Sequence, residues 1–435
     1  MKNNRWKIVL ASLLVLLITG AALSRTPAVR NRLDWRIDLA LTQLRFKLDP
    51  VGALPTPQTS ELPLPLPQVN TTSISPTPPA TASAAATGPT EAPLPTATPS
   101  PEPTPTFPPL PEKVILTPPP MRAGDAQDWN NCGPATLALN LRYFGWGGDQ
   151  YTISDVIKPI RADRNVNVED LTAYVNEEAA PLRALFRVGG SLEQVKRLLA
   201  NGFPVMIEVG FVLPADAQGI TGPSDDRWTG HYLFITGYDD DHQLFIVQDV
   251  YEGGNHVVTY QDADERWQAF NRVYILVYQP EREAELQSLL AGDWDARSNR
   301  QNALNQAQAE TRTESRNAFA WFNLGTNLVY FERYAEAAEA YNQARQIGLP
   351  QRMLRYQFGP FLAYFHAGLF EELNTIADYA LEVTPNSEEG LLWKGWALYR
   401  QGLNQDALQS FQKALEARPG YGDATYAIQF VLENQ

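Results

Sequence analysis

A proline-rich stretch divides this chain into parts that must differ in structure. Residues 51–120 contain 21 of the 34 prolines, mixed with threonine, serine and alanine, and no lysine or arginine occurs between Lys47 and Lys113. Proline lacks the N–H that helices and sheets use, and such a composition buries too little apolar surface to build a core. The sequence therefore predicts a disordered, extended linker over residues 50–113, a stalk that holds the following domains away from whatever precedes it and that also suits O-glycosylation.

The residues before the linker predict attachment to a membrane. Residues 8–23 carry no charge and follow a basic N-terminal tip. This run is slightly short for a full span of about 17–25 residues, although its neighbours can extend it at the interfaces. We expect residues 1–24 to form a cytoplasmic tip and an uncleaved transmembrane anchor. The alternative is a cleaved signal peptide, because the small residues at positions 20–22 suit processing.

Residues 29–49 predict a second helix. Leu33, Ile37, Leu41 and Leu44 share one face, with basic residues elsewhere. Such a helix can lie on the lipid surface beside the anchor, and a helical spacer or an oligomer contact is the alternative. A proline-rich stalk is more natural outside the cell, so we expect the later domains to be extracytoplasmic.

Composition excludes several classes of function. The net charge of −14 argues against nucleic-acid binding, which usually needs a basic patch. A single cysteine rules out an intramolecular disulfide and a cysteine-based zinc site, and the four histidines show no metal-ligand spacing. We therefore predict no metal and no cofactor.

The single cysteine, Cys132, stands at the expected start of a helix. Gly133 and Pro134 follow it, and then an apolar, helix-forming run continues to Phe144. Proline suits the first turn of a helix, and the unpaired N–H groups there favour a thiolate. The alternative is a buried structural cysteine, since free cysteine is among the most buried residue types.

The region after Cys132 alternates between helical and strand patterns. Apolar residues at helical spacing predict helices over residues 152–160, 166–178 and 191–201, the last with Gly202 as its C-cap. A polar segment over residues 212–230 is long enough for a functional loop such as a lid. β-branched and aromatic runs predict strands over residues 203–211, 231–238, 243–251 and 273–278.

The two strands 231–238 and 243–251 predict a hairpin that brings a histidine to an acid. If Tyr238 pairs with His242, Ile235 lies opposite Phe245 and His231 opposite Asp249. Opposed residues share a face with Cβ atoms roughly 4.5–5.5 Å apart, and a slip by one residue would separate them. The alternative for His231 is a polar cap at a strand end.

These motifs resemble those of a known family. Gln127, Cys132-Gly133-Pro134-Ala135, Gly230-His231-Tyr232, Thr236-Gly237-Tyr238 and Gln248-Asp249 are similar to the bacteriocin-processing cysteine peptidases. Those are papain-like domains that cleave double-glycine leader peptides in peptide exporters, and the resemblance covers about residues 114–279.

The resemblance implies a papain-like α+β domain over residues 114–280 that acts on a peptide or protein substrate. By that match Cys132 is the nucleophile and His231 the general base and acid, while Asp249 orients the imidazole and Gln127 donates to the oxyanion. Two departures stand out: Asn131 replaces the acid that many members carry before the cysteine, and helical repeats, not an ABC transporter, follow the domain.

Residues 281–435 repeat with a helical pattern. Pro385 and Pro419 give a period of 34 residues, and Pro350 lies one residue off that register. The pattern resembles tetratricopeptide repeats: three repeats with a degenerate middle copy, closed by a capping helix over residues 421–432. An all-α solenoid of this type offers a surface for a peptide or protein partner. The alternative is that the repeats only brace the peptidase-like domain.

Two functional hypotheses follow. The first is a membrane-anchored, extracytoplasmic cysteine peptidase with a Cys-His-Asp site, whose repeats recruit substrate or a partner. The second is a catalytically inactive papain-like binding module in a membrane-tethered tetratricopeptide scaffold.

Overall fold

The computed structural model describes residues 52–57, 108–122, 124–128, 130–158, 166–212 and 228–434, together with Leu44 and Leu48. The predicted anchor over residues 1–24, nearly all of the helix over 29–49, most of the linker and the loop at 213–227 lie outside the described residues. Among the helices that the structure describes, none is long and apolar enough to cross a membrane.

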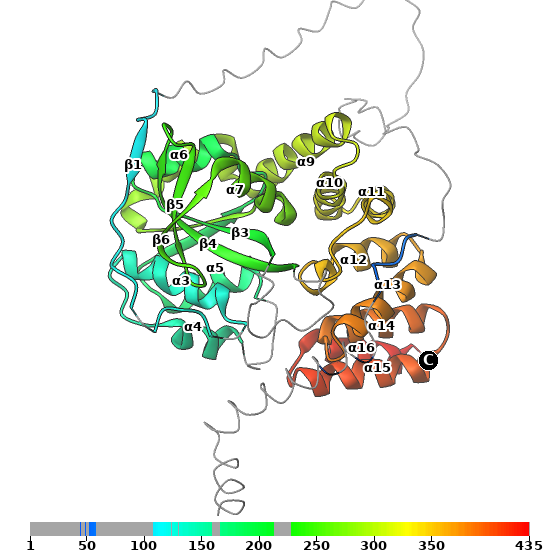
Figure 1. The fold of residues 1–435 in the computed structure, drawn as a ribbon. Helices are drawn as coiled ribbons and strands as arrows, with labels where there is room; N and C mark the ends of the chain where they lie inside the picture. Colours follow the sequence, from blue (N-terminus) through cyan, green and yellow to red (C-terminus); the bar gives the residue numbers. More distant parts are fainter. Residues whose placement is uncertain are drawn as a thin grey trace, which may run out of the picture. The chain divides into compact units, whose positions relative to one another are not determined.

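An antiparallel sheet of seven strands forms the centre of the first folded region (Figure 1). The strand order is β2-β7-β3-β4-β5-β6, and β1 pairs with β4 beside this path. The strands are β1 (Lys113–Ile115), β2 (Arg183–Arg187), β3 (Val205–Val212), β4 (Trp228–Asp239), β5 (Leu244–Asp249), β6 (Gly253–Thr259) and β7 (Tyr274–Tyr278).

The four strands predicted from the sequence are therefore confirmed as β3, β4, β5 and β7. Strand β6 was not predicted from the sequence, and its first residues, Gly253, Gly254 and Asn255, are of types that favour turns. Gly253 and Asn255 do adopt positive φ angles of 116° and 54°, yet the backbone still pairs with β5. The turn-forming residues mark a local irregularity inside a strand, which glycine permits.

Helices cover both faces of the sheet (Figure 1). The helices of this region are α3 (Cys132–Tyr143), α4 (Gln150–Ile157), α5 (Val168–Glu178), α6 (Leu192–Ala200), α7 (Tyr260–Trp267) and α8 (Glu283–Leu290), with 3-10 turns η1 (Gln268–Phe270), η2 (Pro280–Arg282) and η3 (Ala291–Trp294).

Two apolar cores result from the alternation of side chains along the strands. Met206 and Tyr232 pack in one core with residues of α3, α4 and α5. Their chain neighbours Ile207 and Leu233 pack in the other core with residues of α6 and α8. Since successive strand residues point to opposite faces, an almost continuous apolar run is what a sheet buried on both sides requires.

Helix α6 shows how local sequence sets these elements. The Ser191 side chain accepts a hydrogen bond from the Gln194 N–H and caps the helix. Val195, Leu198 and Leu199 are fully buried, and each such side chain contributes about 1.5–3 kcal/mol to folding. Gly202 follows at φ 74°, a conformation that glycine adopts without strain.

The C-terminal region is helical and tetratricopeptide-like. Its helices are α9 (Ala296–Thr313), α10 (Ala318–Tyr330), α11 (Tyr334–Ile347), α12 (Gly359–His366), α13 (Phe370–Val383), α14 (Glu388–Arg400), α15 (Asn404–Ala417) and α16 (Gly422–Glu433), with the 3-10 turn η4 (Met353–Arg355) before α12.

Small residues allow the paired helices to approach closely. A Cβ atom built on Gly325 would lie 2.7 Å from the Tyr341 ring, and one built on Gly395 would lie 2.3 Å from the Phe411 ring. In both pairs the glycine precedes the aromatic residue by 16 positions, so the first and last repeats use the same contact. Glycine is required here because the neighbouring helix presents a ring against its backbone.

The middle repeat is irregular for a structural reason. Its first helix, α12, has only eight residues and follows η4. Between them, Tyr356 Oη lies 2.7 Å from Thr229 Oγ1 on β4, and Gln357 Nε2 donates to the Ala269 carbonyl at 2.8 Å. The degenerate copy thus contacts the sheet region, as α10 of the first repeat also does through Asn323 and Asn327.

Candidate active site

Cys132 is the first residue of α3, as the sequence predicted. The helix is buried from Gly133 to Arg142, whereas Cys132 is only partly buried. A Cβ atom on Gly133 would lie 3.3 Å from the Tyr232 ring, so glycine lets the helix start sit directly on β4. The first N–H groups of any helix have no partner within it. The thiol therefore lies where these N–H groups favour negative charge.

His231 and Asp249 are in direct contact. His231 Nε2 and Asp249 Oδ1 are 2.8 Å apart, and the two residues are only 3% and 2% exposed. Cys132 is close enough to the imidazole to contribute to its raised pKa. The structure thus brings three of the four candidate residues together.

The predicted strand register that led to this pair is wrong. The structure pairs Phe245 with Tyr238 and not with Ile235, which is a shift of three residues from the predicted register. An odd shift, if it continued along the strands, would place His231 and Asp249 on opposite faces of the sheet. The ladder shifts between Ile235 and Gly237, so that Val247 pairs with Ile235 and the offset becomes two. An even offset keeps His231 and Asp249 on one face. The β-bulge at Thr236 therefore preserves the contact that the simple register predicted.

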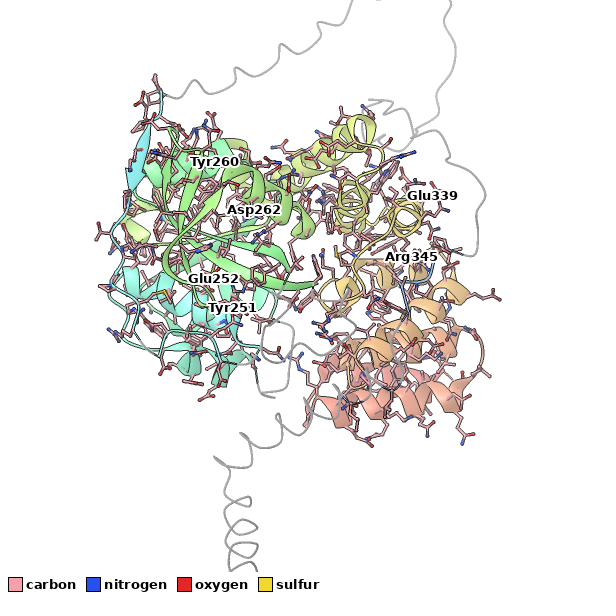
Figure 2. All side chains as sticks on the ribbon, in the orientation of Figure 1. Tyr251, Glu252, Tyr260, Asp262, Glu339 and Arg345 are labelled. Carbon is pink, nitrogen blue, oxygen red and sulfur yellow. The ribbon has the colours of Figure 1, made fainter. Side chains whose placement is uncertain are left out.

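The electrostatic surroundings favour a protonated His231 beside an ionised Asp249. Burial alone lowers the pKa of His231, but its interactions with Asp249 and Cys132 outweigh burial and raise the pKa to about 10. Burial opposes ionisation of Asp249, yet its contacts with His231 and the Tyr251 and Glu252 N–H groups lower its pKa. Those N–H groups donate to Oδ1 at 2.7 and 3.3 Å. Figure 2 labels Tyr251 and Glu252, which follow β5 in the chain.

Aromatic rings enclose the imidazole. The Phe211 ring centroid lies 5.3 Å from that of His231, and the Tyr251 ring lies 6.5 Å away with an edge orientation. Apolar rings at these distances limit access of water to the His231–Asp249 pair, and lower polarity strengthens the interaction between them.

Gln127 lies next to the acid, but among the described residues its side chain has no hydrogen bond that would assign its role. Its backbone N–H donates to the Val250 carbonyl at 2.9 Å, immediately after Asp249. Its Oε1 atom is buried and accepts no hydrogen bond from the residues that the structure describes. Val250 in turn packs in the small core against which Cys132 lies. The backbone thus holds Gln127 close to both Asp249 and Cys132.

Gln150 is a residue that the sequence reasoning missed. Its Oε1 accepts from the Asp128 N–H and from Asn131 Nδ2 at 2.9 and 2.8 Å. Its Nε2 donates to the Gly124 and Ala126 carbonyls at 3.1 and 2.9 Å. One buried amide therefore ties together the segment that carries Gln127 and leads into Cys132. A glutamine in the first turn of α4 gave no periodic signal.

These contacts also account for Asn131. The residue stands where many bacteriocin-processing peptidases carry an acid, and here its amide pairs with an amide, that of Gln150. Its carbonyl accepts the Ala135 N–H and begins the hydrogen bonding of α3. Asn131 therefore joins the helix start to the Gln127 segment.

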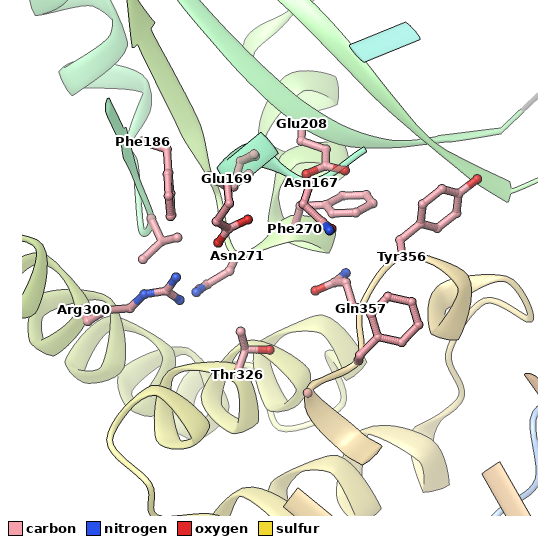
Figure 3. Close-up of a pocket in the computed structure, with 15 residues that line it drawn as sticks. Asn167, Glu169, Phe186, Glu208, Phe270, Asn271, Arg300, Thr326, Tyr356 and Gln357 are labelled. Atoms are coloured by element: carbon pink, nitrogen blue, oxygen red, sulfur yellow. The ribbon is translucent and has the colours of Figure 1, made fainter. Parts of the chain in front are cut away.

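The structure describes a pocket of about 180 Å³ (Figure 3). It is lined by Glu208 of β3, Glu169 of α5, Arg300 of α9 and Gln357 of the η4–α12 connection. Glu208 pairs with Tyr232 across the β3–β4 ladder. Burial raises the pKa of Glu208 well above its usual range. Tyr232 separates this carboxyl group from the helix that starts at Cys132.

Comparison with solved structures finds similar proteins for both regions. A protein from Bacillus anthracis described as a C39-like peptidase is 18% identical, covers 38% of this chain and 98% of its own, and has a TM-score of 0.29. Xylellain, a cysteine protease from Xylella fastidiosa, is 15% identical over 39% of this chain and 87% of its own, with a TM-score of 0.29. YrrB, a TPR protein with an unusual peptide-binding site, is 21% identical, covers 35% of this chain and 73% of its own, and has a TM-score of 0.28.

Comparison of the sequence with curated proteins and with protein-family models addresses the peptidase-like region. No curated protein matches the chain. Residues 116–275 match the model described as the Peptidase_C39 like family. This range contains Cys132, His231, Asp249 and Gln127. Residues 116–275 thus form a papain-like domain that is similar to the C39-like peptidases, followed by a tetratricopeptide-like helical region.

Proposed function

We propose that this chain is a membrane-anchored, extracytoplasmic cysteine peptidase that hydrolyses peptide bonds through Cys132, His231 and Asp249. The observation that carries the proposal is the buried His231, which hydrogen bonds to Asp249 at 2.8 Å and whose pKa is raised by the nearby thiol at the start of α3. A nucleophile, a base and an orienting acid placed close to one another are what nucleophilic catalysis needs.

The chemistry follows from this arrangement. The Cys132 sulfur, as thiolate, attacks the substrate carbonyl carbon, and the oxygen takes up the negative charge. N–H donors at the helix start, with Gln127 Nε2, would stabilise that oxyanion. The imidazolium of His231 gives its proton to the leaving amine as the C–N bond breaks. Water then attacks the acyl-enzyme, His231 takes its proton, and the thiolate and a carboxylic acid are released.

Alkylation of the thiol tests the site without a known substrate. Iodoacetamide should react with Cys132 at pH 7 at least about tenfold faster than with a free peptide cysteine, because in the proposed mechanism His231 activates the thiol for nucleophilic attack. His231→Gln should bring the rate down to that of the peptide. In parallel, the wild-type chain should cleave members of a peptide library that Cys132→Ala leaves intact.

The opposite outcome identifies the alternative. Slow alkylation in the wild-type chain, together with no difference in cleavage between wild type and Cys132→Ala, would leave the inactive binding module as the better description. Retained affinity of Cys132→Ala for a bound peptide would then be the activity to measure.

The proposed location rests on the sequence before the linker, and the proposed recruiting role rests on the helical repeats. Protease added to intact cells should digest the folded domains and spare the N-terminal tip if they are extracytoplasmic. Digestion only after the membrane is opened would reverse the proposed orientation.

A further inference from the structure

A short piece of the proline-rich linker lies on the helical repeats. Residues 52–57, Gly-Ala-Leu-Pro-Thr-Pro, run beside α12 and α13, as the short blue stretch in Figure 1. The Tyr379 hydroxyl of α13 donates to the Gly52 carbonyl at 3.0 Å. Arg345 of α11 donates to the Pro55 carbonyl from Nε and Nη2 at 3.0 and 2.9 Å. Two helices thus bind the backbone of one extended segment.

The contacts recur every three residues. The bound carbonyl groups belong to residues 52 and 55, and the buried side chains are Leu54, 7% exposed, and Pro57. Ala53 and Thr56 are exposed. Proline locks its own φ and biases the preceding residue toward extended backbone, and a polyproline helix has three residues per turn. The segment therefore presents one face to the repeats and the other to solvent.

The repeats contain a binding group that needs such a partner. Arg345 is 2% exposed, and its Nη1 donates to Tyr364 Oη and Glu372 Oε2 at 2.9 and 2.8 Å. This leaves Nε and Nη2 directed at the Pro55 carbonyl. A buried guanidinium is costly unless its donors are satisfied, and hydrogen bonds from a charged group are about twice as strong as neutral ones. Burial, geometry and charge all support specific recognition of a backbone carbonyl.

We propose that the surface of α11, α12 and α13 around Arg345 and Tyr379 is a binding site for an extended, proline-containing peptide, and that residues 52–57 of this chain occupy it. The linker was expected to act as a stalk over residues 50–113. With residues 52–57 bound, the first part of the linker belongs to the folded repeats and not to the stalk. The site ties the repeats to the N-terminal end of the linker.

Thiol accessibility in the full chain tests this site. Single cysteines are introduced by Leu54→Cys, Pro57→Cys, Ala53→Cys or Thr56→Cys, each with Cys132→Ala so that one thiol remains. A bulky maleimide should label positions 54 and 57 at least about tenfold more slowly than 53 and 56, because opening must precede the reaction of a buried group. Adding Tyr379→Phe, which removes the donor to Gly52, should accelerate labelling at position 54 severalfold and leave position 53 unchanged.

The comparison separates binding from a general effect on folding. All four variants lie within six residues, and circular dichroism of each gives the helical content. Equal labelling rates at positions 53, 54 and 56 in folded protein would overturn the proposal. So would a rate at position 54 that stays the same after Tyr379→Phe.

Discussion

The hydroxyl of Tyr356 lies 2.7 Å from that of Thr229, two residues before His231 on the same strand. Tyr356 also packs edge-on against Trp228 and Phe270, whose rings stack on each other. A residue of the repeats is therefore part of the support of the strand that carries the candidate general base. This contact couples the stability of the two regions.

Replacing Tyr356 should weaken that coupling. Tyr356→Ala should lower the free energy of unfolding by about 1–3 kcal/mol, since it removes aromatic contacts and one hydrogen bond. Tyr426→Ala is the matched control, because Tyr426 is 62% exposed on α16, and it should stay within about 0.5 kcal/mol. Urea unfolding measures both. A loss no larger for Tyr356 than for Tyr426 would contradict the structural role of this contact.

Because of the His231–Asp249 pair, the free energy of unfolding should fall as the pH rises into the alkaline range. The folded-state pKa of His231 is about 10 against an ordinary value of 6.5, so the folded state binds the proton more tightly. The contribution of His231 is full below pH 6.5 and is lost as the pH rises toward 10. Asp249→Asn should abolish most of this slope, whereas Asp241→Asn, at an exposed position, should retain it. Unfolding free energies at pH 6, 8 and 9.5 decide between these outcomes.

Glu208 should make the stability of the folded protein depend on pH between the acidic and the neutral range. Its folded-state pKa is raised above 4.5 by burial, so its contribution is present at low pH and is lost as the pH rises through the folded-state value. Glu208→Gln keeps the shape without the charge. We expect its melting temperature to exceed that of wild type by about 2–4 °C at pH 8 and to equal it at pH 4. Glu177→Gln, at an exposed position, should change neither.

Gln150 should affect catalysis through the position of Gln127. Gln150→Glu keeps one acceptor oxygen at the position of Oε1 but replaces Nε2, the donor to the Gly124 and Ala126 carbonyls, with a second oxygen. Leaving buried groups unpaired costs about 1–3 kcal/mol each. On a cleaved peptide we expect kcat to fall about tenfold or more, as for a misplaced oxyanion donor, while alkylation of Cys132 changes little. An unchanged kcat would show that Gln150 is not needed to position this segment.

Close helix packing predicts that a small change in the last repeat is costly. Gly395→Ala places a methyl group 2.3 Å from the Phe411 ring, and overpacking of this kind costs about 1–3 kcal/mol. Gly422→Ala is the control, because nothing lies within 4 Å of the added methyl group; it should be neutral or slightly stabilising, as alanine favours helices. Thermal melts of both variants test the difference, and equal effects would argue against the close contact.

Several elements could be predicted because their signals are local. The helix start at Cys132, the helix over residues 191–201 and the strands β3, β4, β5 and β7 depend on residues that are adjacent or a few positions apart. His231 and Asp249 could be placed on one face because side chains alternate along strands. The register itself could not, since the bulge at Thr236 depends on three-dimensional packing of β4 between its neighbours.

Other features depend on contacts between distant residues. Gln150 binds a segment about twenty residues earlier, Glu208 faces a cavity completed by Arg300 and Gln357, and Arg345 binds the Pro55 carbonyl. A polar side chain that meets its partner across a fold leaves no periodicity in the sequence. The sequence by itself determined the elements and the motif residues, because side-chain period and local capping are properties of neighbouring positions. Only the tertiary structure decided the register, the support of the site and the peptide bound to the repeats, because these depend on which distant polar groups must be paired once they are buried.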